Sequence, residues 1–245
     1  MRQSLLRFSL TLGVIGTTLI GSVLGSNFPA QALPEEEVVK TLEGVPVFMI
    51  TDLEGRPVPL SLSLGGQNVE KKDLAVFFIS EDNAEEVVEK LESQSSQLEG
   101  KVEARALPLS QAYQLMMANQ ELEDSPFLFF PERSQVQEAV KILRQENSQV
   151  QGFNAVPLFV AKQVIKTGDQ EEEKYLTFQQ GDREVIPVFF DIKQLEESIK
   201  ASQAENPELS SSAIAIDVIS LEDMINLLHS SDNEQLKNLV FMPLK

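Results

Sequence analysis

The chain has 245 residues, and its 38 acidic side chains against 20 basic ones give a formal net charge of −18 at pH 7. Such an acidic chain is a poor partner for nucleic acid, whose phosphates require a cationic face, and for anionic lipid surfaces. The absence of cysteine excludes thiol catalysis, iron–sulfur clusters, thiolate zinc sites and disulfides.

The first 32 residues have the features of a secretory signal peptide. Arg2 and Arg7 precede an uncharged stretch over residues 8–24, and Ala30-Gln31-Ala32 matches a small-residue cleavage site. An uncleaved membrane anchor is the alternative, but glycine and threonine dilute the apolar stretch, so we expect cleavage after Ala32. Removal of this segment leaves 213 residues with a net charge of −20. No later segment is long and apolar enough to predict stable insertion in a membrane.

Residues 33–133 alternate between helix and strand signals. Three acidic residues from Glu35 onward begin a short helix, and Ser80 is a favourable N-cap for a longer one. The apolar run 75–79 has the length of a strand and predicts burial on both faces. The predicted helices cover 35–42, 81–97 and 110–117, and the predicted strands cover 45–51, 58–64, 75–79, 102–107 and 127–130.

Residues 134–245 repeat this plan after an amphipathic linking helix at 134–149. Asp191 and Ser220 are the predicted N-caps of two further helices, and Glu171–Glu173 belong to a predicted charged loop. The predicted strands cover 156–165, 175–178, 185–190, 213–219 and 239–242.

Three apolar segments of the first half return in the second at offsets of 111, 112 and 112 residues. The pairs are 44–48 with 155–159, 74–78 with 186–190, and 127–131 with 239–243. A period this long indicates two copies of one folded unit, because solenoid repeats have periods of roughly 20–50 residues. We therefore expect an internally duplicated α/β fold. Its two similar halves of mixed β-sheet and helices, 33–133 and 134–245, would be related by a pseudo-two-fold axis and packed as one body.

Chemistry-bearing motifs are scarce. His229 is the single histidine, and a helix-end position near the negative end of the helix dipole is the alternative to a general base or a metal ligand. Glu171–Glu173 with Asp169 and Asp182 offer oxygen ligands for Ca²⁺ but lack the calcium-loop pattern. Gly65-Gly66 lacks the strand–turn–helix setting of a phosphate loop. The sequence therefore predicts no catalytic residue, no metal site and no cofactor.

Apolar side chains gather on two helices that occupy matching positions in the halves. Methionine is flexible and polarizable and suits surfaces that bind varied apolar partners, although ordinary core packing is the alternative for any one of these residues. We expect the two clusters to line paired client-binding grooves. The predicted client-binding residues are Leu115, Met116, Met117, Met224, Leu227 and Leu228.

The segment Leu42-x-Gly44-Val45-Pro46-Val47-Phe48, the buried Val-Phe-Phe strand, the duplicated plan and the acidic body resemble the Tic22-like family. That family is named for the twenty-two-kilodalton component of the translocon at the chloroplast inner envelope. The resemblance implies a butterfly-like α/β protein in the space between two membranes, with no enzymatic activity and no cofactor. No residue-level site carries over, because the matching motifs are the strands that build the fold.

A secretory signal in place of a transit peptide makes the chain resemble a cyanobacterial, periplasmic member of that family. The resemblance then implies a role in outer-membrane biogenesis, with unfolded precursor proteins and an outer-membrane barrel-assembly protein as partners. The first hypothesis is therefore a periplasmic chaperone or translocation factor that binds unfolded apolar segments. The alternative is a non-catalytic adaptor whose acidic surface docks on the barrel-assembly machinery.

Overall fold

The computed structural model describes residues 14–15, 33–62, 72–119, 127–167, 170–205, 209, 213–231 and 233–244. The helices in these ranges are α1 (Glu35–Leu42), α2 (Glu81–Gln94), α3 (Leu109–Ala118), α4 (Arg133–Glu146), α5 (Ile192–Glu205), α7 (Leu221–Ser230) and the 3-10 helix η1 (Glu234–Asn238). The strands are β1 (Val14–Ile15), β2 (Pro46–Asp52), β3 (Leu60–Leu62), β4 (Lys72–Phe78), β5 (Val102–Pro108), β6 (Phe127–Phe130), β7 (Pro157–Thr167), β8 (Gln170–Leu176), β9 (Phe178–Gln180), β10 (Arg183–Phe189), β11 (Ala213–Ser220) and β12 (Leu239–Met242).

The α/β class expected from the sequence is confirmed, because these strands form two mixed sheets covered by helices. The predicted charged loop is wrong in part, since Glu171–Glu173 belong to β8 and pair with β7. The predicted signal peptide lies outside the described residues, apart from β1, which pairs antiparallel with β8. The Gly65-Gly66 segment also lies outside them. Among the described residues, none of the helices has the length and apolar character needed to cross a bilayer.

The first sheet is built around β4. This strand pairs antiparallel with β2 and β3 and parallel with β6, and β5 adds antiparallel to the other edge of β2. Phe77 and Ile79 pack into one apolar cluster, whereas Val76 and Phe78 pack into another on the opposite face. This alternation confirms the predicted burial of the 75–79 run on both faces.

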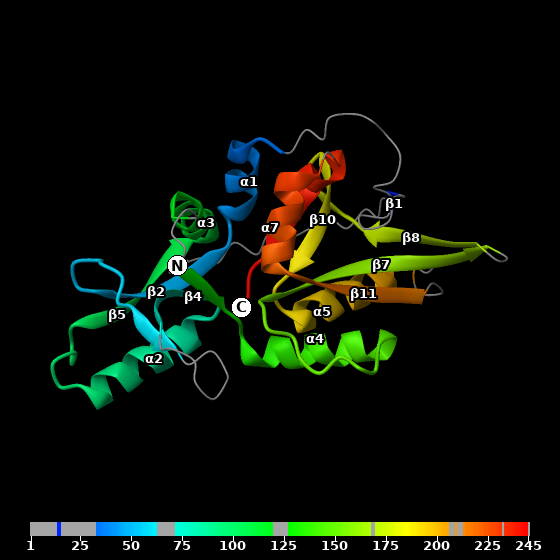
Figure 1. The fold of residues 1–245 in the computed structure, drawn as a ribbon. Helices are drawn as coiled ribbons and strands as arrows, with labels where there is room; N and C mark the ends of the chain where they lie inside the picture. Colours follow the sequence, from blue (N-terminus) through cyan, green and yellow to red (C-terminus); the bar gives the residue numbers. More distant parts are fainter. Residues whose placement is uncertain are drawn as a thin grey trace.

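The second sheet shows the same pairings around β10. This strand pairs antiparallel with β7 and β9 and parallel with β12, and β11 adds antiparallel to β7. β8 extends the sheet by pairing with the far part of β7, so that the two strands reach away from the helices (Figure 1). In each half, the last strand therefore lies parallel to the central strand of its sheet.

The strand pairing corrects the sequence match of one repeated segment. Phe78 lies opposite Phe48 in the first sheet, and Phe189 lies opposite Phe159 in the second. The counterpart of Phe78 is thus Phe189, one residue before the Phe190 that the sequence match assigns. A slip of one residue moves a strand side chain to the opposite face. Accordingly, Phe190 packs on the inner face of its sheet, whereas Phe78 and Phe189 pack on the outer faces.

A central apolar cluster joins the two sheets. It combines the inner face of each sheet with side chains of α1, α3 and α7, and Figure 1 shows α1 and α7 lying between the sheets. Two outer clusters complete the layers, one between the first sheet and α2 and the other between the second sheet and helices α4 and α5. Residues from both halves therefore share one core.

The two helices that open the halves lie in different layers. α1 buries Val38 and Leu42 in the central cluster, whereas α4 buries Ala139 against the outer face of the second sheet. Gln135 on α4 accepts a hydrogen bond from the Ile192 backbone amide at 3.0 Å. This bond ties the linking helix to the start of α5, so α4 is a connection into the second half rather than a counterpart of α1.

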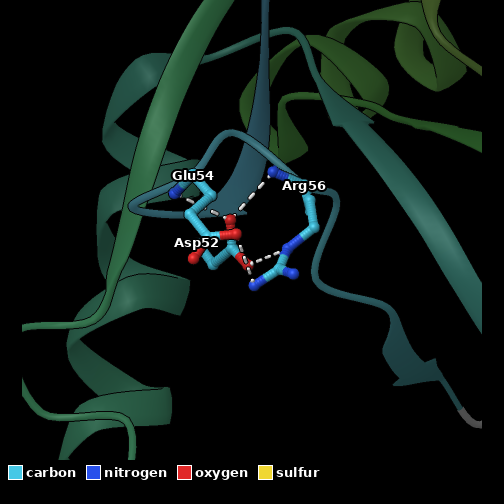
Figure 2. A network of polar contacts seen from close by, with 3 residues as sticks. All are labelled: Asp52, Glu54 and Arg56. Atoms are coloured by element: carbon cyan, nitrogen blue, oxygen red, sulfur yellow. Dashed lines mark hydrogen bonds and ion pairs between the residues drawn. The ribbon is translucent and has the colours of Figure 1, made fainter.

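The turn after β2 is held by Asp52, as Figure 2 shows. Its carboxylate accepts hydrogen bonds from the backbone amides of Glu54 and Arg56 at 3.0 and 2.9 Å, and from the Arg56 Nε at 2.7 Å. The Arg56 backbone amide is the main reason that the pKa of Asp52 lies below its ordinary value. Gly55 has a φ of 82°, a left-handed backbone conformation that residues with a side chain rarely adopt, so this turn favours glycine.

A buried ion-pair network stabilises the extended part of the second sheet. Lys162 on β7 lies 2.7 Å from Asp217 on β11 and 3.0 Å from Glu173 on β8, and its side chain is only 13% exposed. Tyr175 donates a hydrogen bond to Asp217 at 3.2 Å. Burial disfavours the charged ammonium group, but the hydrogen bonds to Asp217 and Glu173 outweigh it and raise the pKa of Lys162. Lys162 thus pairs with Glu173 of the acidic run, and Lys174 pairs with Glu172 at 3.1 Å.

Replacing Lys162 with methionine should lower the free energy of unfolding by about 1–3 kcal/mol, because two partly buried carboxylates lose their shared cation. Lys141→Met is the matched control, since the Lys141–Glu138 pair is exposed and should contribute no more than about 0.5 kcal/mol. Urea denaturation of the two variants measures both values. Equal losses would contradict the structural role given to Lys162.

Candidate apolar binding site

The six predicted client-binding residues all lie at the central cluster. Met224 is 2% exposed and Leu228 is fully buried, so neither offers surface to another molecule in this structure. The other four are partly buried and pack against the same cluster. Within the described ranges, α3 and α7 turn apolar side chains inward toward α1 and the central cluster, so Met224 and Leu228 serve as core residues. A client-binding role for the partly buried residues stays a prediction.

His229 contacts Tyr113 across the two halves. Its Nε2 lies 2.5 Å from the Tyr113 hydroxyl, with the donor set by the imidazole tautomer, and the two rings are 5.4 Å apart at their centroids. Tyr113 belongs to α3 and His229 to α7, so this contact crosses the central core. Burial, with a smaller effect of the Glu35 charge, raises the pKa of Tyr113.

Glu222 on α7 lies in an environment that disfavours its charged form. No described residue donates a hydrogen bond to its buried Oε2. Burial raises the pKa of Glu222, the neighbouring Asp223 charge adds to the effect, and a hydrogen bond from its own backbone amide opposes it. Within the described ranges, no three His, Asp or Glu side chains are arranged to hold a metal ion, and Asp169 of the calcium alternative lies outside those ranges.

An apolar pocket that the sequence did not predict lies on the outer face of the second sheet. It has a volume of about 170 Å³ and is enclosed by β9, β10, β12 and α5. Two polar side chains, Gln180 and Ser198, line it together with apolar groups. The apolar lining residues are Phe178, Val185, Pro187, Phe189, Ala201, Val240 and Met242.

Small side chains on α5 create this pocket. When α2 and α5 are aligned by their first residues, Glu81 and Ile192, Ser198 matches Val87 and Ser202 matches Leu91. Val87 and Leu91 pack against the outer cluster of the first sheet. Ser198 lines the pocket and has less apolar volume than Val87. Ser202 is buried outside the lining and donates its hydroxyl to the Ser198 carbonyl at 2.8 Å.

The pocket can accept one apolar side chain. An apolar cavity of roughly 150 Å³ is large enough for a benzene ring, so this one accommodates an aromatic or branched aliphatic group. Full burial of such a side chain contributes about 1.5–3 kcal/mol. No titratable side chain lines the pocket, so its chemistry is reversible apolar binding.

The fold is that of a mixed α/β protein whose two sheets share a central helical core. A family model described as the Tic22-like family matches residues 7–244. The chain belongs to the Tic22-like family.

Similar proteins agree with this assignment. The protein TIC 22-like, chloroplastic, of Arabidopsis thaliana is 26% identical over 219 residues, which cover 87% of this chain and 62% of that relative. The chain thus spans less than two thirds of its curated relative.

Two solved structures share the fold. Anabaena Tic22, whose title gives protein transport, matches with a TM-score of 0.67 and 21% identity over 86% of this chain and 93% of that one. Tic22 from Plasmodium falciparum matches with a TM-score of 0.62 and 20% identity over 84% and 91%. At these identities, the likeness concerns the fold alone.

Glu222→Gln should raise the free energy of unfolding at pH 7. A carboxyl whose pKa is raised by folding destabilises the folded state wherever it is ionised, and this penalty vanishes below its unfolded value of 4.5. The advantage of the Glu222→Gln variant over the unaltered chain should therefore be present at neutral pH and disappear as the pH falls below about 4.5. Urea denaturation between pH 4 and 8, with exposed Glu86→Gln as the control, tests this; an advantage that grows toward acid pH would contradict it.

Met224→Ala should lower the free energy of unfolding by about 2–5 kcal/mol, because it leaves a cavity in the central core. Met117→Ala, at a partly buried site of the same cluster, should cost less. Denaturation measures stability, and binding to an unfolded client is measured on the same preparations. If Met224→Ala left stability unchanged but weakened client binding, the core assignment of Met224 would be wrong.

Proposed function

We propose that this protein is a non-enzymatic protein-transport factor of the periplasm that acts as a chaperone for unfolded outer-membrane precursors. The observation that carries the proposal is the apolar pocket between β10, β12 and α5, which is sized for one client side chain. Membership of the Tic22-like family and the protein-transport title of Anabaena Tic22 support the transport class. Unfolded outer-membrane strands carry alternating apolar residues and aggregate when unprotected, so they suit such a binder.

Binding by this pocket needs no ATP. A client side chain enters the hollow beside Ser198 and Ala201 and loses contact with water, which contributes about 1.5–3 kcal/mol before ordering costs. A binding free energy of this size corresponds to a weak affinity for a single site, so the client can be released. The large negative charge of the protein keeps the complex with an aggregation-prone client in solution.

We also infer that the halves arose by internal duplication and are related by a pseudo-two-fold axis, giving a butterfly-like body. The support is the matched pairing: Phe48 with Phe78 in one sheet and Phe159 with Phe189 in the other. The Leu109 and Leu221 amides likewise donate to the Val45 and Val156 carbonyls at 2.7 and 2.9 Å. Under this inference, the second half gained the pocket when smaller side chains replaced larger ones on α5.

Export to the periplasm completes the proposal. The segment with Arg2, Arg7 and the Ala30-Gln31-Ala32 site would direct export and be removed after Ala32. The compartment gives access to unfolded outer-membrane precursors and to the barrel-assembly protein of the outer membrane. Detection of Leu33 as the first residue of the exported protein would support this part.

An adaptor that docks on the barrel-assembly machinery is the second candidate. It is favoured by the excess of 38 acidic over 20 basic residues, which would steer the protein to a basic partner. Such docking is salt-sensitive and independent of the apolar pocket. Binding to a folded assembly protein with no affinity for unfolded clients would favour the adaptor.

Filling the pocket should impair the chaperone. Ala201→Leu places a larger side chain in the lining, so the Kd for an unfolded outer-membrane barrel should rise by about tenfold, equivalent to losing one buried client side chain. Suppression of barrel aggregation at near-stoichiometric ratio should weaken in parallel.

Ala204→Leu is the matched control, because Ala204 is exposed on the same helix but lies outside the lining. It should bind and protect the client as the unaltered chain does. If neither variant changed binding, the pocket would not be the client site. If the unaltered chain gave no protection and did not bind barrel-derived peptides, the chaperone proposal would fail.

A further inference from the structure

A second hollow of about 440 Å³ lies between α1, β10, η1 and β12. Its floor is apolar, with Leu33, Leu239 and Phe241 among the lining residues. Val240 lines both this hollow and the apolar pocket, so both reach β12. The hollow lies on the side of the inner-facing Leu239 and Phe241, and the pocket lies on the outer face of the sheet. A volume in this range is that of a small-ligand site and accommodates one or two amino-acid residues.

Three cations line the hollow although the chain has nearly twice as many acids as bases. Lys40 comes from α1, Arg183 from β10 and Lys237 from η1, and Glu37 is the one acidic lining residue. The second half and α1 together therefore assemble a local excess of positive charge in an otherwise acidic protein.

One of these cations, Arg183, is held by a hydrogen bond. Nη2 of Arg183 donates a hydrogen bond to the Lys237 carbonyl at 3.1 Å, which connects β10 to η1. Among the described residues, neither Lys40 nor Arg183 forms an ion pair, in contrast to the doubly paired Lys162. The guanidinium has five N–H donors in a planar fork, a shape that fits a carboxylate.

A peptide's last residue matches this combination better than other anions do. Its carboxylate and its apolar side chain leave the same carbon atom, so the first can meet the cations while the second lies on the Leu239 and Phe241 floor. An internal Asp or Glu lacks the apolar group. Glu37 at the rim opposes a doubly charged phosphate more than a single carboxylate.

We propose that this hollow binds the free carboxyl terminus of a client whose last side chain is apolar. The proposal rests on the chaperone function proposed above and names a recognition element for its clients. The terminal carboxylate pairs with Arg183 and Lys40, and the last side chain covers the apolar floor. The hollow and the apolar pocket, which share only Val240 in their linings, are then two separate contact points for a client.

The test uses the full chain and a dye-labelled synthetic octapeptide of alternating apolar and polar residues that ends in phenylalanine. The free acid should bind about tenfold more tightly than the C-terminal amide, because only the acid forms charge-assisted hydrogen bonds. Arg183→Gln and Lys40→Gln should each weaken binding of the acid by roughly three- to tenfold and leave the amide unchanged.

Lys193→Gln is the matched control, since Lys193 is exposed on α5 and does not line the hollow. It should not alter the preference for the acid. Equal binding of acid and amide, or a loss with Lys193→Gln as large as with Arg183→Gln, would overturn the proposal.

Vesicles containing phosphatidylglycerol distinguish a lipid headgroup from a peptide terminus. They should not bind, and vesicle binding that Arg183→Gln abolished would overturn the proposal. Preference for the acid is independent of aggregation suppression, so the two proposals can fail separately. If the protein suppresses barrel aggregation but binds the acid and the amide equally, only the inference drawn from the cationic hollow is contradicted.

Discussion

The central apolar cluster is the constraint on which the rest of the structure depends. Inner faces of both sheets and three helices bury their side chains in it, so neither half can complete its core alone. Because the most apolar helix faces are used here, α3 and α7 have their apolar groups committed to stability. Two hollows lie elsewhere, on the outer face of the second sheet and at the junction of α1 with β12.

Much of the fold could be predicted because strands and helices carry strong local signals. The run from Ala75 to Ile79 is apolar at every position, which required burial on two sides, and Ser80 and Ser220 cap helices where their side chains accept from the third following amide. Register could not be predicted as well. Matching one Phe-Phe pair onto the other in the sequence placed Phe78 with Phe190, but cross-strand pairing gives Phe189. A sequence alignment matches identical residues, but the hydrogen-bonded pairing of the strands decides which face of the sheet each side chain occupies.

The candidate site was harder to predict, for a physical reason. An apolar run such as Leu115 to Met117 is compatible with either an exposed groove or a buried core, because its apolar character does not indicate which part of the protein packs against it. The pocket is lined by small residues of α5, such as Ser198, where a large apolar side chain would fill the space. Small residues of this kind produce no hydrophobic pattern in the sequence. Aligning the helix starts at Ser80 and Asp191 would have shown serine opposite Val87 and suggested the missing volume. The shared hollow of Lys40 and Arg183 could not be predicted, because the two residues come to line it only through packing of α1 near β10 and β12.

In the proposed account, weak apolar burial in the pocket and charge-assisted hydrogen bonds in the cationic hollow together hold the client. Methyl NMR of the methionines tests this most directly, because Met242 lines the pocket whereas Met224 lies in the core. On titration with an unfolded outer-membrane barrel, the Met242 methyl signal should shift and the Met224 signal should stay in place. Shifts at Met116 and Met117 with an unchanged Met242 signal would contradict the account and return the client to the central helices.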